Sequence, residues 1–174
     1  MSKFKIQPIK TKVAQAIRET MIDQAGHQLS VSIANENGYG PCRSCLKQFT
    51  AGERRILFSY SPNAVDHPYN ETGPIYIHAE ACEPYQETDT FPPEVENGRI
   101  KFPLVFRAYN EKGMVVSSVL QNGEPASTTI ESLFENEKVA FAHVRNAQAG
   151  CFVAHVDRAE CNENAEEDKS STYV

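Results

Sequence analysis

The feature that most constrains this chain is a set of four residues that could share one metal ion. Cys42 and Cys45 form a C-x2-C pair, and an H-x3-C pair, His78 and Cys82, follows after thirty-two residues. Structural zinc sites use four thiolate and imidazole ligands in a tetrahedron. The sequence therefore predicts a metal site, with zinc as the expected cofactor, held by Cys42, Cys45, His78 and Cys82. We expect a helical turn over 80–83, since positions four apart share one helix face.

Two other interpretations of these cysteines stay open. Free cysteines are among the most buried residue types, so they could be reduced thiols of a core that binds no metal. Pro41-Cys42-x-x-Cys45 also has the spacing of a thioredoxin-like redox motif, which belongs at the start of a helix in a βαβ unit. The segment after Cys45 instead has an antiparallel pattern, and Gly52 would soon end any helix.

The residues around the cysteines form two longer motifs, Cys42-x2-Cys45-Leu-Lys-x-Phe49-x2-Gly52-Glu53-x-Arg55-Ile56 and Tyr76-x-His78-x3-Cys82. Together they resemble the poly(ADP-ribose)-polymerase-type zinc finger, which has a treble-clef pattern. The finger has H-x2-C where this chain has H-x3-C, so the pattern departs from the finger at Cys82.

A second resemblance covers nearly the whole chain. The motifs that carry it are Pro41-Cys-Arg-x-Cys45-Leu, Gly52-Glu53, Ser59-Tyr60-x-Pro62, Tyr69-x-Glu71-x-Gly73-Pro74-Ile-Tyr-Ile-His78-Ala79 and His143-Val-Arg145-Asn146-Ala147-x2-Gly150-Cys151. These motifs are similar to those of the bacterial domain-of-unknown-function family 1203, and the resemblance implies a stand-alone bacterial protein without an assigned activity.

Length and composition predict one globular domain over residues 1–159, within a chain of 174 residues. No window approaches eighteen apolar residues and the N-terminus has no apolar run, so we expect neither a membrane span nor a signal peptide. The default location is therefore the cytoplasm, where five cysteines, an odd number, argue against a disulfide framework. Residues 160–174 are acidic and rich in serine, and we expect them to be disordered.

The charge distribution bears on the partners. The net charge of −6 disfavours nucleic-acid binding, which needs a basic field. Near the cysteines alone, nucleic-acid binding remains an open alternative, because basic residues cluster there. They are Arg43, Lys47, Arg54 and Arg55. The sequence names no partner beyond a small anionic ligand, for which arginine is the natural binding group.

Hydrophobic patterning predicts an α+β fold with one curved antiparallel sheet or partial barrel and one or two packed helices. Helices are expected over 11–25, capped by Thr11 and ended by Gly26, and over 127–134. Two hairpins are expected, because turn-forming residues separate paired strand patterns; they cover 101–120 and 139–158. Further strands are expected over 4–6, 29–33, 55–60 and 75–79.

The last hairpin carries a second candidate site. Alternation places Phe141, His143 and Arg145 on one face, which becomes polar toward the turn, as the rim of a ligand pocket would. His143 could act as an acid or base, and Arg145 could hold a carboxylate or phosphate. The other predicted ligand-binding residues are Asn146, which could instead orient its own turn, and Arg107. The alternative is that these are polar strand ends in contact with water.

Two functional hypotheses follow. The first is a small, zinc-supported binding module without catalysis; the second is an enzyme whose pocket combines His78 with His143 and Arg145, with or without metal. Cys151 could be a nucleophile if His143 or His155 reaches it. The chain has no phosphate-binding glycine loop, no nucleotide-binding G-x-G-x-x-G and no G-x-S-x-G or H-E-x-x-H motif, so the usual forms of those chemistries are excluded.

Overall fold

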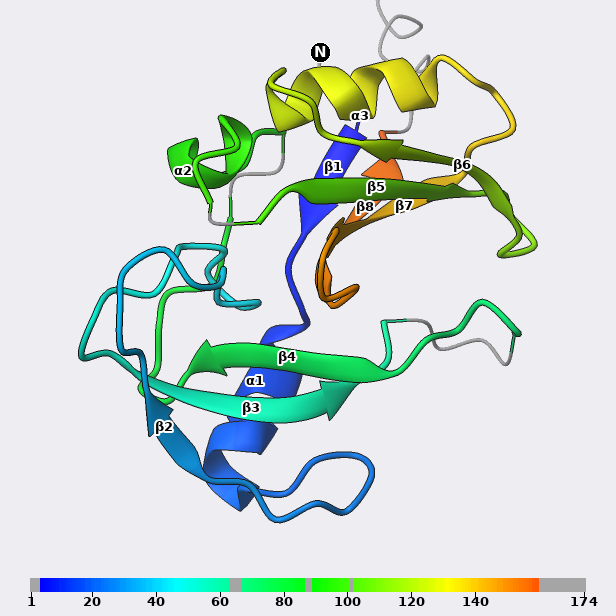
Figure 1. Cartoon of the computed structure of the whole chain (residues 1–174). Helices are drawn as coiled ribbons and strands as arrows, with labels where there is room; N and C mark the ends of the chain where they lie inside the picture. Colours follow the sequence, from blue (N-terminus) through cyan, green and yellow to red (C-terminus); the bar gives the residue numbers. More distant parts are fainter. Residues whose placement is uncertain (1–3, 63–66, 87–88, 101, 160–174) are drawn as a thin grey trace, which may run out of the picture.

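The computed structural model describes residues 4–62, 67–86, 89–100 and 102–159, and it shows an α+β fold with two open antiparallel sheets (Figure 1). The larger sheet has the strand order β1-β8-β7-β5-β6 and the smaller one the order β2-β3-β4. The elements are β1 (Phe4–Gln7), α1 (Thr11–Thr20), β2 (Val31–Ile33), β3 (Arg54–Tyr60), β4 (Gly73–His78), α2 (Pro93–Glu96), β5 (Leu104–Tyr109), β6 (Val115–Leu120), α3 (Ala126–Phe134), β7 (Phe141–Asn146) and β8 (Phe152–Arg158).

The larger sheet packs one face against α3, and this contact forms the first of two hydrophobic cores. Alternation along the strands turns Phe106, Val144 and Val156 inward, where they meet Ile130 and Leu133 of α3. The two predicted hairpins are confirmed: β5 pairs with β6, and β7 pairs with β8. The opposite face of this sheet carries the polar residues of the second candidate site.

The smaller sheet packs against α1 and forms the second core. Ala14 and Ile17 lie one helical turn apart on α1 and contact a layer that includes Ile56 of β3 and Ile77 of β4. Figure 1 shows this sheet and α1 in the lower half of the molecule, with the larger sheet and α3 above. None of the described helices is long and apolar enough to cross a membrane.

Two segments tie the sheets together. The chain passes from β1 in the larger sheet directly to α1 beneath the smaller one, and Phe152 of β8 packs into the second core against Tyr60, with ring centroids 5.6 Å apart. The turn after Cys42 contributes to both cores, since Cys42 and Cys45 belong to the second and Leu46 to the first. The cysteine segment therefore lies where the two cores meet.

The structure differs from the sequence prediction in the number of sheets and the length of the first helix. The predicted class, α+β and antiparallel, is confirmed, but the strands divide into two sheets rather than one curved sheet or partial barrel. Helix α1 ends at Thr20, not near Ala25, because Met21 is left-handed (φ 52°) and the Asp23 carboxylate accepts the amides of Ala25 and His27. Such local side-chain hydrogen bonds compete with the helix. The predicted disordered tail, 160–174, lies outside the described residues.

Candidate functional site

The four predicted metal ligands lie together at the second core, close to the point where the two cores meet. Cys42 and Cys45 come from the loop between β2 and β3, His78 is the last residue of β4, and Cys82 follows a bend after it. One ligand atom from each residue lies within 4.8 Å of every other. Cys42 is fully buried and Cys45 is 5% exposed, so the site is closed on the side of the protein interior.

The distances fit a tetrahedral zinc site. The sulfurs of Cys42 and Cys82 are 3.9 Å apart, and the Cys45 sulfur is 3.6 Å from Nδ1 of His78. Ligands at about 2.3 Å (sulfur) and 2.0 Å (nitrogen) from one tetrahedral zinc lie roughly 3.8 and 3.6 Å apart in such pairs. These four residues could therefore hold a zinc ion, and the cluster is a plausible zinc site.

The backbone that carries Cys42 and Cys45 is a tight turn fixed by its own hydrogen bonds. The Leu46 amide donates to the Cys42 carbonyl at 2.8 Å, and the Cys42 amide donates to the Lys47 carbonyl at 2.9 Å. Gly40 precedes the turn with φ +127°, and a Cβ at this position would lie 3.0 Å from the Phe49 ring. Glycine is required there by both the dihedral angle and the close approach.

Cys82 reaches the cluster without the helical turn predicted over 80–83, which is absent. The chain bends at Ala79 and Glu80 and then runs extended past the cysteine turn, where the Tyr85 amide donates to the Ser44 carbonyl at 2.9 Å. Pro84 explains the difference, since proline cannot donate a helical hydrogen bond and disfavours a helical residue before it. The H-x3-C spacing therefore works through a bend rather than through one face of a helix.

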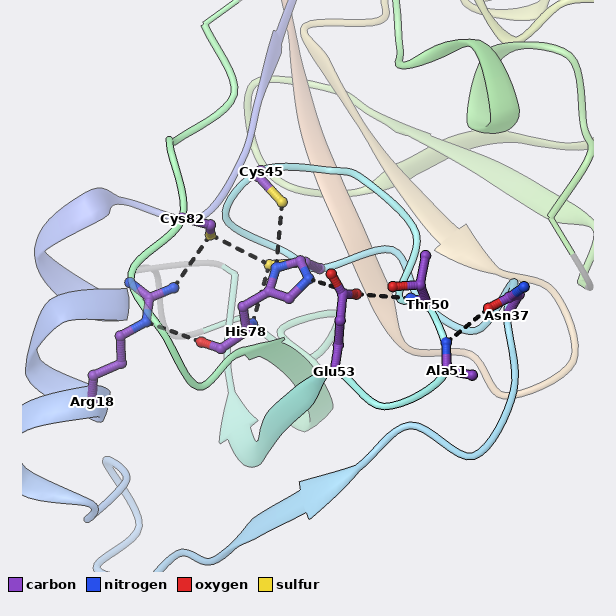
Figure 2. A network of polar contacts seen from close by, with 9 residues as sticks. Arg18, Asn37, Cys45, Thr50, Ala51, Glu53, His78 and Cys82 are labelled. Carbon is purple, nitrogen blue, oxygen red and sulfur yellow. Dashed lines mark hydrogen bonds and ion pairs between the residues drawn. The ribbon is translucent and has the colours of Figure 1, made fainter.

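Two further side chains hold the ligands in place (Figure 2). Oε2 of Glu53 lies 3.2 Å from Nε2 of His78 and accepts the Thr50 amide at 2.7 Å. Arg18 of α1 donates to the Cys82 sulfur at 3.4 Å and to the His78 carbonyl at 3.0 Å. A carboxylate on the far nitrogen of a ligating histidine orients the ring and raises its basicity. Glu53 and Arg18 are thus positioning residues of the cluster.

The protonation states show that the thiols and the imidazole of the cluster are coupled to one another. Hydrogen bonds with Cys42 and then Cys45 lower the pKa of Cys82, while contacts with Cys42 and then Cys82 raise the pKa of Cys45. Hydrogen bonds with Cys42 and Cys82 raise the pKa of His78 to about 10. The sulfurs therefore share protons among themselves and with the histidine, and a divalent cation would replace those protons.

Arg43, next to Cys42, links the cluster to the hairpin of β7 and β8. Its side chain is 3% exposed and donates to the carbonyls of Phe152, at 2.6 Å, and of Pro41. It also donates to the Cys151 sulfur at 3.2 Å. The polar partner that the structure shows for Cys151 is therefore an arginine, whereas the sequence suggested His143 or His155.

The second predicted set lies on the polar face of the larger sheet. Arg107 of β5 is opposite His143 of β7 in the strand register, and Arg145 follows on the same face. Glu71, in the loop before β4, pairs with both arginines: its Oε1 lies 2.7 Å from Arg107 and its Oε2 lies 2.8 Å from Arg145. Asn146 instead accepts the amides of Gln148 and Ala149, so its oxygen is used by the turn.

His143 is fully buried in an aromatic environment. Its ring centroid is 5.0 Å from that of Tyr109 and 5.3 Å from that of Phe152. Burial, together with nearby His155, Arg145 and Arg107, lowers the pKa of His143 to about 2. His143 is therefore neutral near pH 7 and carries one N–H donor and one acceptor nitrogen.

Sequence patterns gave no role to Glu53, Arg18 or Glu71, and they indicated Arg43 only as one of four basic residues near the cysteines. Glu53 and Glu71 stand inside the quoted family motifs, and this position was the available signal. Glu53 lies 25 positions from its partner His78. Glu71 lies 36 positions from Arg107 and 74 positions from Arg145. The sequence gives no measure of such contacts, since they depend on how the sheets come together.

Comparison with known proteins identifies one family. A family model described as "Protein of unknown function (DUF1203)" matches residues 38–158, which include both candidate sites, and no zinc-finger family matches. The resemblance to the finger is therefore limited to the four ligand-type residues and their surroundings. Searches of the curated proteins and of the solved structures each found no match. Because the family model covers most of the chain, this protein belongs to the DUF1203 family.

Proposed function

We propose that this protein is a small binding module supported by one structural zinc ion. The observation that carries the proposal is the mutual distance of four donor atoms, all within 4.8 Å, from Cys42, Cys45, His78 and Cys82. Thiolate and imidazole donors in this ratio suit zinc better than the hard cations, which prefer oxygen ligands.

The donor set supports a structural rather than a catalytic ion. Four protein ligands fill a tetrahedron, whereas catalytic zinc keeps one position for water. Glu53 and Arg18 also contact two of the ligands, His78 and Cys82. A surface depression of about 460 Å³ is lined by Cys45, His78 and Cys82, and it offers an ion a path to the site.

The position of the cluster explains what zinc would stabilise. The four ligands join the loop after β2, the end of β4 and the segment that leads to α2. Through Arg43 the same turn reaches the carbonyl of Phe152 on β8. A bound ion would therefore fasten the smaller sheet to the hairpin of the larger sheet.

The alternative proposal is an enzyme that combines His78 with His143 and Arg145. The polar contacts of His78 go to the cysteines, Glu53 and Arg18, while the ion pair of Arg145 goes to Glu71. These are separate networks, which favours the binding module. A cytoplasmic, bacterial origin also belongs to the proposal, and it agrees with the free thiols of Cys42, Cys45, Cys82 and Cys151.

Metal analysis of protein purified without added metal tests the proposal. We expect about one zinc ion per chain, as a single tetrahedral site requires. The thiols of the cluster should react with a thiol reagent only after a chelator is added, whereas the remaining cysteines should react before it. Protein that contains no metal, with all five thiols reacting at once, would contradict the proposal.

A further inference from the structure

On the polar face of the larger sheet, several buried side-chain nitrogens have no hydrogen-bond partner. We call Arg107 and Arg145, together with the neutral His143 beside them, the cationic face. Within the described part of the chain, both ring nitrogens of His143 and Nε and Nη2 of Arg145 are buried without a hydrogen-bond partner. Buried polar groups are nearly always paired, so each exception requires an explanation. Three of these four groups are donors, namely Nε and Nη2 of Arg145 and the single N–H of neutral His143, and they lack acceptors.

Glu71 shows which acceptor the cationic face takes. Its carboxylate gives one oxygen to Arg107 and the other to Arg145, at 2.7 and 2.8 Å. The two arginine side chains are 28% and 4% exposed, whereas the Glu71 side chain is 45% exposed. The fixed part of this contact is thus the arginine pair, and the carboxylate comes from an accessible side chain that can turn into water.

A cavity of about 300 Å³ adjoins Arg145 and its partner Glu71, which holds Arg107 with its other oxygen. Tyr60, Pro74, Cys151 and Phe152 are among the other residues that line it. The lining combines aromatic rings and a proline with one ion pair, and such a mixture of apolar and charged groups can hold a small organic molecule. The volume is at the lower end of such sites, so it suits a small ligand.

We propose that Arg107 and Arg145 bind the carboxylate of a small organic acid, whose body lies in this cavity, and that Glu71 holds the same position until the ligand displaces it. The inference rests on the proposed function, because it names the ligand of the binding module. Arginine forks match carboxylates in geometry as well as in charge. A displaced Glu71 would leave the buried Arg145 without a counter-charge, so another anion must take its place.

Calorimetric titration of the protein with benzoate, at constant ionic strength, tests the inference. Glu71→Gln removes the internal competitor but keeps the side-chain shape, and we expect it to bind benzoate about tenfold more tightly than the original protein if Glu71 occupies the site most of the time. Glu80→Gln is the matched control, since Glu80 also pairs with an arginine, Arg54, at 2.7 Å but on the exposed end of the smaller sheet. Unchanged affinity in Glu71→Gln would overturn the inference.

Arginine variants made in the Glu71→Gln background complete the test. Arg145→Gln should abolish benzoate binding; where it fails to fold, Arg107→Gln, at a more exposed position, should weaken binding at least tenfold. Retained affinity in a folded variant, or tighter binding of inorganic phosphate than of benzoate, would overturn the carboxylate site. Zinc content is measured in every variant: an unchanged metal content with lost benzoate binding separates this site from the cysteine cluster.

Discussion

The cysteine cluster and the cationic face are both polar sites between packed layers, but their side chains carry an excess of opposite charge. In the cluster, three sulfurs and one imidazole compete for protons, and Glu53 adds a further negative charge. On the cationic face, two arginines share one carboxylate and leave buried nitrogens unpaired. The donor atoms of the first site suit a cation, and those of the second suit an anion. Charge balance inside the fold, rather than residue type alone, indicates what each site binds.

The largest expected effect comes from removing a ligand of the cluster. Cys45→Ser should lose the zinc and lower the melting temperature by many degrees, because structural zinc contributes apparent binding energies of about 10–16 kcal/mol in finger peptides. Each sheet retains its own core, so the variant should loosen rather than unfold completely. Metal analysis and thermal melts measure both effects.

Cys151→Ser is the control for Cys45→Ser. Cys151 contacts Arg43 but lies outside the four-residue cluster, so its replacement should leave the zinc content unchanged. Equal metal content in Cys45→Ser and the original protein would show that the cluster holds no ion.

Arg43→Met tests the connection between the two regions. The substitution leaves the carbonyls of Phe152 and Pro41 buried without their donor, and each unpaired group costs about 1–3 kcal/mol. We expect the free energy of unfolding to fall by about 3 kcal/mol in denaturant titrations. Arg54→Met is the matched control, because Arg54 is 58% exposed. A loss no greater than that of the control would show that Arg43 does not fasten the sheets.

Glu53→Gln tests the outer side of the cluster. Loss of the carboxylate on His78 should weaken zinc binding about 10- to 100-fold, as removal of such partners does in other metal sites. Competition with a chromophoric chelator measures the affinity. Glu71→Gln carries the same change on the other site and should leave zinc affinity unchanged. Equal effects of the two substitutions would mean that the regions are not independent.

Acid titration should reveal the buried histidine. The pKa of His143 is lowered to about 2 in the fold, against an ordinary value of 6.5, so below pH 6.5 the unfolded chain binds a proton that the folded chain does not. This group therefore reduces the free energy of unfolding by about 1.4 kcal/mol for each pH unit below 6.5. His143→Phe, which fits the aromatic surroundings, should remove that component. An unchanged pH slope in the variant would show that His143 is protonated in the fold.

Local patterns predicted most of the elements, and long-range contacts account for the differences. The hairpins follow from strand alternation around turns with glycines at positive φ, Gly113 and Gly150. The early end of α1 depends on the Asp23 side chain, which also accepts the Ser59 amide from β3, 36 positions away. Alternation states which side of a strand is buried but not which sheet it joins, so the division into two sheets was not predictable.

For the candidate sites, too, residues close in sequence were predictable, whereas contacts between distant segments were not. Four ligand-type residues in two close pairs identified the cluster, because metal geometry constrains their spacing. The bend at Ala79 and Glu80 was missed, although Pro84 was a visible signal against a helix there. Glu71 was invisible as a partner of Arg145, since the loop that carries it meets the other sheet only in the folded chain.

The pairing of β1 with β8 has a consequence for how the chain folds during synthesis. Phe4 lies opposite Arg158, so the larger sheet cannot be completed until the end of β8 has left the ribosome. The smaller sheet, α1 and all four cysteine-cluster residues lie between positions 11 and 82 and are available much earlier. Long sequence separation slows the formation of contacts. In a growing chain the smaller sheet and the cysteine cluster can therefore form before β1 pairs with β8.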